Sequence, residues 1–282
     1  MEDHNIEMPY ELVKSGKWTF DELFNMVKDV YIDVNGNTAK DEGDVFGYTC
    51  YAQRESWGCA FDLDVFGEVD GNLKITLNAD KAADIISKMY SFYFEQNGVY
   101  VTTDYEINGV IQVPYHRNLF KAGNVMVTEM EIKYIGDELR YSDIDYGILP
   151  MPKWDEAQDN YYSSGSGQTV VIPKTNPDLE FTGIILDAMC YETYTRIVPA
   201  YYEFALKEKF LQNEEDKAMI DIITDTATSW PAYLYGSYTG LGGIVDTLMQ
   251  SKNKDFASWY ASLKPVADKS ITVLQSILES ED

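Results

Sequence analysis

Two stretches decide the fold: TFDELFNMVKDVY at residues 19–31 and VFGYTCY at residues 45–51. In the first, Thr19 and Glu22 form a capping box ahead of apolar residues at helical spacing, which predicts an amphipathic helix. The second is short and rich in aromatic and β-branched residues, as strands are. A further strand is predicted at residues 73–77, and Asn78 is the predicted N-cap of the helix that follows. Alternation of this kind indicates an α/β chain.

Later in the chain the balance shifts from strands to helices. Strands are predicted at residues 124–132, 145–149 and 169–172. After them, Asn176 and Pro177 are expected to start a helix, and Pro199 to break it. Asn213 is expected to cap the helical C-terminal part, within which Pro265 interrupts or starts a helix. The predicted class is α/β with a helical C-terminal part.

Composition excludes some partners. The 282 residues carry a net charge of −25 and include 22 tyrosines. Nucleic acid needs basic patches that neutralise phosphate, and the sequence has none, so nucleic-acid binding is not expected. The acidity fits a neutral or cationic ligand better than an anionic one, or serves solubility alone. Of the three cysteines, Cys50 and Cys59 either pair across a short loop or remain buried thiols.

The acidic loop at residues 33–44, DVNGNTAKDEGD, is a candidate calcium site. Oxygen donors stand at loop positions one, three, five, nine and twelve, which suits the six to eight hard ligands that calcium takes. They are Asp33, Asn35, Asn37, Asp41 and Asp44. Thr38 replaces the glycine of an EF-hand loop, and Asp44 its final glutamate. A structural Ca²⁺ site and a solvated turn both remain open as interpretations.

Aromatic residues in polar surroundings are candidate ligand contacts. Trp57 lies among Ser and Gly, Trp230 and Tyr233 among Ser, Pro and Ala, and Tyr162 in the polar stretch 157–167. Such rings can stack on the faces of a sugar while nearby carboxylates and amides bind its hydroxyl groups. The alternative is local packing beneath a loop.

Glu129 and Glu131 are the candidate polar contacts. If both lie on the predicted strand 124–132, their spacing of two places them on one face. Three readings are open: hydrogen bonding to a ligand, acid/base chemistry of a glycosidase, and a solvated strand face. No barrel pattern, nucleophile elbow or phosphate loop accompanies them. We therefore predict a binding protein and no enzyme.

Residues 16–23 read GKWTFDEL, and residues 33–47 form an Asp-rich loop that leads into a Phe-Gly strand. Residues 120–127 read FKAGNVMV, residues 145–153 read DYGILPMPK, and the polar stretch 161–173 ends at a proline. In this order, the five segments resemble elements of family 1 extracellular solute-binding proteins of ABC importers, the maltose-binding-protein-like family. The elements are the helix start after the first crossing between lobes, the Asp-rich loop, the "F..G..AM" element, the "YG..PLPK" strand and the return into the N-terminal lobe.

The resemblance implies a periplasmic-binding-protein-like two-lobe fold of type II. Residues 1–157 would form the first part of the C-terminal lobe, 158–212 a segment of the N-terminal lobe, and 213–282 a helical return. Most of the N-terminal lobe would be lacking, so apolar residues of the segment 169–211, including Val170, Ile172, Ile184 and Ile185, are expected to be poorly covered.

The implied function is capture of a solute, most simply an oligosaccharide, for the membrane subunits of an importer, by hinge closure of two lobes. Trp57, Glu129, Glu131, Tyr162, Trp230 and Tyr233 are the expected ligand contacts. Peptides or cationic solutes are the alternative ligands, and a carbohydrate-active enzyme is a third reading. The implied location is extracellular, as a lipoprotein or in the periplasm, although the first residues lack the pattern of a signal peptide.

Overall fold

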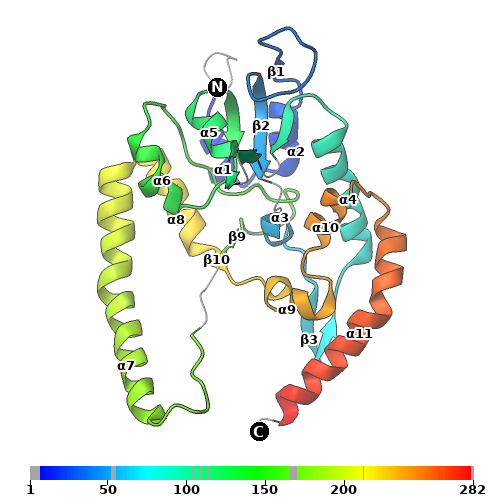
Figure 1. Cartoon of the computed structure of the whole chain (residues 1–282), viewed down its shortest axis with the longest axis vertical. Coiled ribbons are helices and arrows are strands. Elements are labelled where there is room, and N and C mark those ends of the chain that lie inside the picture. Colours follow the sequence, from blue (N-terminus) through cyan, green and yellow to red (C-terminus); the bar gives the residue numbers. More distant parts are fainter. Residues whose placement is uncertain are drawn as a thin grey trace.

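The computed structural model describes residues 7–51, 55–102, 105–107, 110–112, 115–165, 170–211 and 213–280, and it is mixed α/β (Figure 1). The helices, with single turns included, are α1 (Tyr10–Lys14), α2 (Phe20–Val27), α3 (Glu55–Ala60), α4 (Ala79–Phe94), α5 (Tyr115–Lys121), α6 (Lys133–Asp137), η2 (Leu139–Tyr141), α7 (Leu179–Glu192), η3 (Thr193–Ile197), η4 (Ala200–Phe210), α8 (Glu214–Asp225), α9 (Pro231–Thr239), α10 (Ile244–Gln250) and α11 (Phe256–Ser280). The strands are β1 (Tyr31–Ile32), β2 (Val45–Tyr51), β3 (Phe66–Val69), β4 (Asn72–Ile75), β5 (Val99–Thr102), β6 (Tyr105–Ile107), β7 (Val110–Gln112), β8 (Val125–Thr128), β9 (Ser163–Ser164) and β10 (Ala227–Thr228).

The largest sheet is built around β2. Strands β5 and β8 pair with β2 in parallel, and β1 pairs with it antiparallel. The chain leaves β2 toward β5 and then crosses back past β2 to reach β8. Right-handed crossovers in opposite directions place their helices on opposite faces of a sheet. Accordingly, α4 packs into the main hydrophobic core, whereas Leu119 of α5 packs into a separate small cluster with Phe46 and Val125.

Three of the four predicted helix starts are confirmed, because each depends on local capping chemistry. The hydroxyl of Thr19 accepts a hydrogen bond from the Glu22 amide ahead of α2. Asn78 Oδ1 accepts from the Lys81 amide, and Asn213 Oδ1 from the Asp216 amide. Strand β2 also has the predicted bounds.

Other predicted elements are wrong, and each has a visible cause. Residues 145–149 form no strand, since the Ile148 amide donates to Asp216 Oδ1 at 2.8 Å instead of to a neighbouring strand. Helix α7 begins after Asp178, which caps it through the Phe181 amide, and not at Asn176. The chain stays helical through Pro199, because the wider π-helical turns of η3 and η4 flank the residue that lacks an N–H. Helix α11 likewise continues through Pro265, held in the core on both sides of it by Phe256 and Ala267.

One main core joins segments far apart in the sequence. Residues of α2, α3 and α4 pack with residues of α8, α10 and α11, so the last helices return to the body formed by the first hundred residues. No helix in the described ranges is both long and apolar enough to cross a membrane.

The helical run from Leu179 to Phe210 stands apart from this body, and we call it the arm (Figure 1). None of the residues of α7 is buried. The poor coverage expected for apolar residues of the segment 169–211 is confirmed at the four residues named for it: Val170 is 66% exposed, Ile184 60%, Ile185 44% and Ile172 36%. The division into lobes stays a prediction.

Candidate functional site

The carboxyl ends of the parallel strands define the candidate site. β2 and β5 end together at Tyr51 and Thr102, and β8 ends at Thr128, which pairs with Thr49 two residues before the end of β2. In open α/β sheets, ligands bind outside the carboxyl ends of strands, where the connections depart in opposite directions. That change of direction occurs here at β2, between its neighbours β5 and β8.

Glu129 follows β8 directly and lies at this edge. It is half-buried, and the hydroxyl of Tyr48 on β2 donates to its Oε2 at 3.1 Å. Burial and the nearby Glu129 charge raise the pKa of Tyr48 well above its ordinary value, so the phenol stays protonated and remains a donor. The central strand therefore fixes the position of this carboxylate at the end of its neighbour.

Threonine side chains hold the strand ends together. Thr49 donates to the Tyr100 carbonyl at 2.8 Å, Thr102 to the Cys50 carbonyl at 2.9 Å, and Thr128 to the Thr49 carbonyl at 3.0 Å. Because these hydroxyl groups satisfy backbone acceptors near the edge, the strand ends form a rigid base for the side chains that lie there.

A polar cluster from α5 adjoins the same edge. The ring of His116 stacks on Tyr51 with centroids 6.2 Å apart, and Arg117 binds Glu138 Oε1 at 2.8 Å. Burial, reinforced by the Arg117 charge, lowers the pKa of His116 to about 4, so the imidazole is neutral at pH 7. Burial alone would raise the pKa of Glu138, but hydrogen bonds from Lys121 and Arg117 lower it.

Trp57 is not a surface ring. Its side chain is fully buried in the main core, at 5.3 Å and 69° from the Phe20 ring and 5.2 Å from Phe61. The predicted stacking role for Trp57 is wrong, because helix α3 directs this ring into the core and away from solvent.

Trp230 is buried against the same core. Its Nε1 donates to the Leu63 carbonyl at 3.2 Å, and its ring covers Gly58 so closely that a Cβ there would lie 2.3 Å from Cη2. The role predicted for Trp230, lining an open groove, is therefore also wrong. Tyr162 is half-buried against the core, and the side chain of Tyr233 lies outside the described residues.

Glu131 does not share a strand face with Glu129. β8 ends at Thr128, three residues before Glu131. Residues two apart face the same side only within a strand, so this rule does not apply to Glu129 and Glu131. The side chain is exposed and forms an ion pair with Lys133. Of the predicted carboxylate pair, only Glu129 lies against the sheet.

The acidic loop is closed by its own hydrogen bonds. Asp33 accepts from the amides of Gly36 and Thr38, and Asp41 Oδ2 accepts from the Asn35 and Asn37 side chains at 2.9 and 2.7 Å. Buried Asp44 accepts from Tyr31, from the Val34 amide and from the Asp41 amide. Within the described ranges no group of three or more His, Cys, Asp or Glu residues is placed to hold a metal ion. Calcium at this loop stays a prediction.

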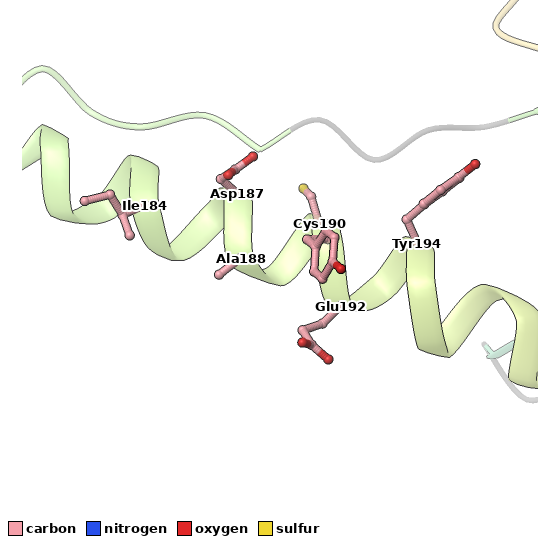
Figure 2. Close-up of a pocket in the computed structure, with 7 residues that line it drawn as sticks. Ile184, Asp187, Ala188, Cys190, Glu192 and Tyr194 are labelled. Carbon is pink, nitrogen blue, oxygen red and sulfur yellow. The ribbon is translucent and has the colours of Figure 1, made fainter.

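A pocket also lies on the arm, but it is an open surface. Figure 2 shows its lining side chains along a single helical run. The set is Ile184, Asp187, Ala188, Cys190, Tyr191, Glu192 and Tyr194. Ligand pockets bury most of their ligand between converging walls, which one helix does not supply.

No family model, curated protein or solved structure matches this chain.

Sequence reasoning missed Tyr48, Tyr51 and His116 as members of this edge. Tyr48 alternates with Phe46 in the strand VFGYTCY, a pattern equally typical of core packing, and Tyr51 is visible only as the last residue of that strand. His116 is far from both in sequence, and only the crossover that brings α5 against β2 and β8 places it there.

Proposed function

We propose that this chain is a solute-binding protein of the family 1 type, which captures a neutral, polyhydroxylated solute at the carboxyl edge of its parallel sheet. The observation that carries the proposal is the half-buried carboxylate of Glu129, held by Tyr48 at the topological switch of the sheet. A fixed carboxylate accepts hydrogen bonds from hydroxyl groups, and charge-assisted bonds of this kind are the stronger ones.

The neighbouring groups suit the same ligand class. Tyr51 offers a ring at the end of β2, and neutral His116 stacks on it. An apolar ring face beside polar acceptors is the combination that a sugar requires, with an apolar face and a rim of hydroxyl groups. In this proposal, Tyr51 and Tyr162 provide the aromatic ligand contacts that the sequence had predicted for the buried residues Trp57 and Trp230.

The motifs in the order of the solute-binding family support the rest of the proposal. A second lobe would close over the edge by hinge motion, and the membrane subunits of an importer would receive the solute. The exported location belongs to the same proposal, as does the absence of an enzymatic activity.

Charge favours one alternative ligand class. With a net charge of −25, the chain attracts cations at long range, so peptides or other cationic solutes are the second candidates. A ligand of that kind would pair its charge with Glu129 and would bind less tightly as salt rises.

A thermal-shift screen separates these candidates. The chain is heated with neutral oligosaccharides, basic peptides and acidic peptides at low and high salt. Binding to the folded state raises Tm by mass action. We expect oligosaccharides to raise Tm equally at both salt concentrations. A shift from basic peptides that disappears in high salt would favour the alternative, and hydrolysis of an oligosaccharide during the assay would overturn the non-enzymatic assignment.

A further inference from the structure

Burial along the arm changes at one point. Every residue from 187 to 200 is exposed, whereas Tyr201 and Tyr202 are half-buried and Leu206 is fully buried. We call residues 179–198 the outer part of the arm and residues 200–210 its base. Since none of the residues of α7 is buried, packing within the described chain does not hold the outer part in one direction.

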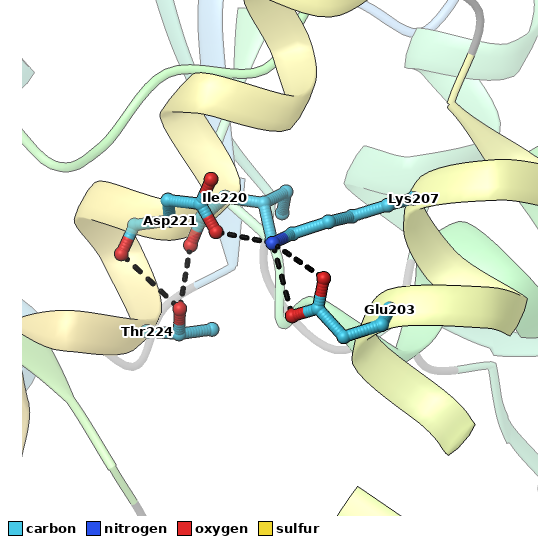
Figure 3. A network of polar contacts seen from close by, with 5 residues as sticks. All are labelled: Glu203, Lys207, Ile220, Asp221 and Thr224. Atoms are coloured by element: carbon cyan, nitrogen blue, oxygen red, sulfur yellow. Dashed lines mark hydrogen bonds and ion pairs between the residues drawn. The ribbon is translucent and has the colours of Figure 1, made fainter. Parts of the chain in front are cut away.

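The base is anchored to the body by an ion-pair network and by apolar packing. Figure 3 shows Lys207 between the carboxylates of Glu203 on η4 and Asp221 on α8, with its Nζ 3.0 Å from Glu203 Oε1. Beside it, Leu206 is fully buried in a cluster with Ile220 of α8. Because α8 also contributes to the main core, the base is fixed relative to the body.

Pro199 lies where the outer part meets the base. It has no N–H, so the helix lacks a backbone hydrogen bond at this point. π-Helical turns flank it on both sides, since η3 ends at Ile197 and η4 begins at Ala200. Sharp bends in helices occur at prolines and at π-helical turns. The junction therefore combines the two features that most often bend a helix.

Thr195 weakens the helix one turn before Pro199. Its hydroxyl donates to the Tyr191 carbonyl at 2.7 Å, and bonds of this kind often bend helices. In an α-helix, the N–H that Pro199 lacks would bond the Thr195 carbonyl. Both changes lie in the same turn, so resistance to bending is lowest there.

We propose that Pro199 is a hinge, about which the outer part of the arm swings while the base stays with the body. Hinges consist of a few residues, often at the ends of elements, that absorb a change in backbone dihedral angles. Pro199 is the single proline of the arm, and it lies where exposed side chains give way to anchored ones.

The bend is a property of the helix itself and requires no ligand. Its role in closing a second lobe over the sheet edge rests on the proposed function, in which residues 158–212 belong to that lobe. The hinge places the pivot inside this segment, so that the outer part of the arm moves with the second lobe and the base does not.

Distances between two spin labels test the hinge in the full chain without a ligand. One label is attached to Cys190, which is exposed on the outer part, and the other to Ala261→Cys on the exposed surface of α11. Cys50 and Cys59 stay unlabelled because both are buried. We expect double electron–electron resonance to give a broad distribution of distances.

A label on the base provides the matched measurement. In Cys190→Ser with Phe204→Cys, which replaces an exposed ring of η4, the distribution should be at least about twofold narrower. Pro199→Ala restores the missing N–H and should narrow the Cys190 distribution by about the same factor. Gly183→Ala also raises helix propensity, but it lies on the far side of Cys190 from the hinge and should leave the distribution unchanged.

Circular dichroism verifies that each labelled variant is folded. Equal widths for the labels at positions 190 and 204 would overturn the hinge, as would a Pro199→Ala distribution as broad as that of the wild type. Equal narrowing by Gly183→Ala and Pro199→Ala would assign the motion to general fraying and overturn it too. None of these results depends on whether a sugar binds at Glu129, so the hinge and the proposed function can fail separately.

Discussion

The hydroxyl of Tyr48 donates to Glu129 Oε2 at 3.1 Å, and this bond joins the central strand β2 to the residue that follows β8. Since Tyr48 is buried, the bond transmits the rigidity of the core to a carboxylate at the edge of the sheet. The buried side chain of Tyr48 therefore fixes the position of the Glu129 carboxylate in the candidate site.

Tyr48→Phe should lower the free energy of unfolding by about 1.5–3 kcal/mol, because a hydrogen bond to a charged group is lost. Urea denaturation measures the change. Tyr238→Phe, on an exposed ring of α9, is the control and should be neutral. Equal stability of the Tyr48 and Tyr238 variants would show that Glu129 is not held in this way.

The fit of Trp230 over Gly58 predicts an overpacking cost. Gly58→Ala places a methyl group against a ring fixed by its hydrogen bond to Leu63, and it should destabilise the fold by about 1–3 kcal/mol. In contrast, Gly183→Ala on α7 meets nothing within 4 Å and should be neutral or stabilising. Denaturation curves in which the two variants shift alike would contradict the burial of Trp230.

Local chemistry explains which features were predictable. The caps at Thr19, Asn78 and Asn213 depend on residues within three positions, so the sequence alone identifies them. Trp57 and Trp230 lie in equally polar local surroundings, yet their burial depends on contacts with Phe20 and Leu63, which are distant in sequence.

The residues of the candidate site also differ in whether local sequence predicts them. The sequence indicates Glu129 because it lies within a recognisable strand pattern at residues 124–132, although β8 ends one residue before it. The pairing with Glu131 depended on the end of that strand, and a difference of a few residues at strand ends changes which side chains share a face. Tyr51 and His116 meet only through the crossover between β5 and β8, which no short pattern encodes.

The three cysteines should differ sharply in reactivity. Cys50 and Cys59 are buried, and burial followed by the Asp62 charge raises the pKa of Cys59 to about 11, whereas Cys190 is exposed on α7. Because the thiolate is the nucleophile, dilute folded protein should react with maleimide at one site near pH 7.5, and unfolded protein at three. Mass spectrometry counts the adducts, and Cys190→Ser should show none when folded. Rapid labelling of Cys59 in folded protein would contradict its burial.

Asp216 should contribute a distinctive pH dependence. It is buried and accepts hydrogen bonds from Tyr10, Ile148 and Asn213, but burial raises its pKa above the ordinary value of 3.8. The folded state therefore holds this proton more tightly, and the associated stability is present below the ordinary pKa and lost as pH rises through the folded value.

Asp216→Asn removes this titration. The stability of the wild type relative to Asp216→Asn should fall as pH rises from about 3.5 through the folded pKa and then become constant. Urea denaturation at a series of pH values gives both curves. Parallel curves, or a relative stability that rises with pH, would contradict the direction of the shift.

Calcium at the acidic loop would have to displace hydrogen bonds that Asn35 and Asn37 make to Asp41. If it binds, millimolar calcium should raise Tm relative to chelator by mass action, and Asp41→Asn should remove most of the rise. Identical melting curves in calcium and chelator would leave these residues as a hydrogen-bonded turn.

Isothermal titration of an oligosaccharide panel into the wild type, Glu129→Gln and Glu131→Gln tests the central claim most directly. We predict that a neutral oligosaccharide binds the wild type, and that Glu129→Gln weakens binding by about ten- to a hundredfold, as expected for loss of a charge-assisted hydrogen bond of about 1.5–3 kcal/mol. Glu131→Gln, on an exposed carboxylate paired with Lys133, should bind like the wild type. If no oligosaccharide binds, or if both variants bind as tightly as the wild type, the sheet edge is not a sugar-binding site.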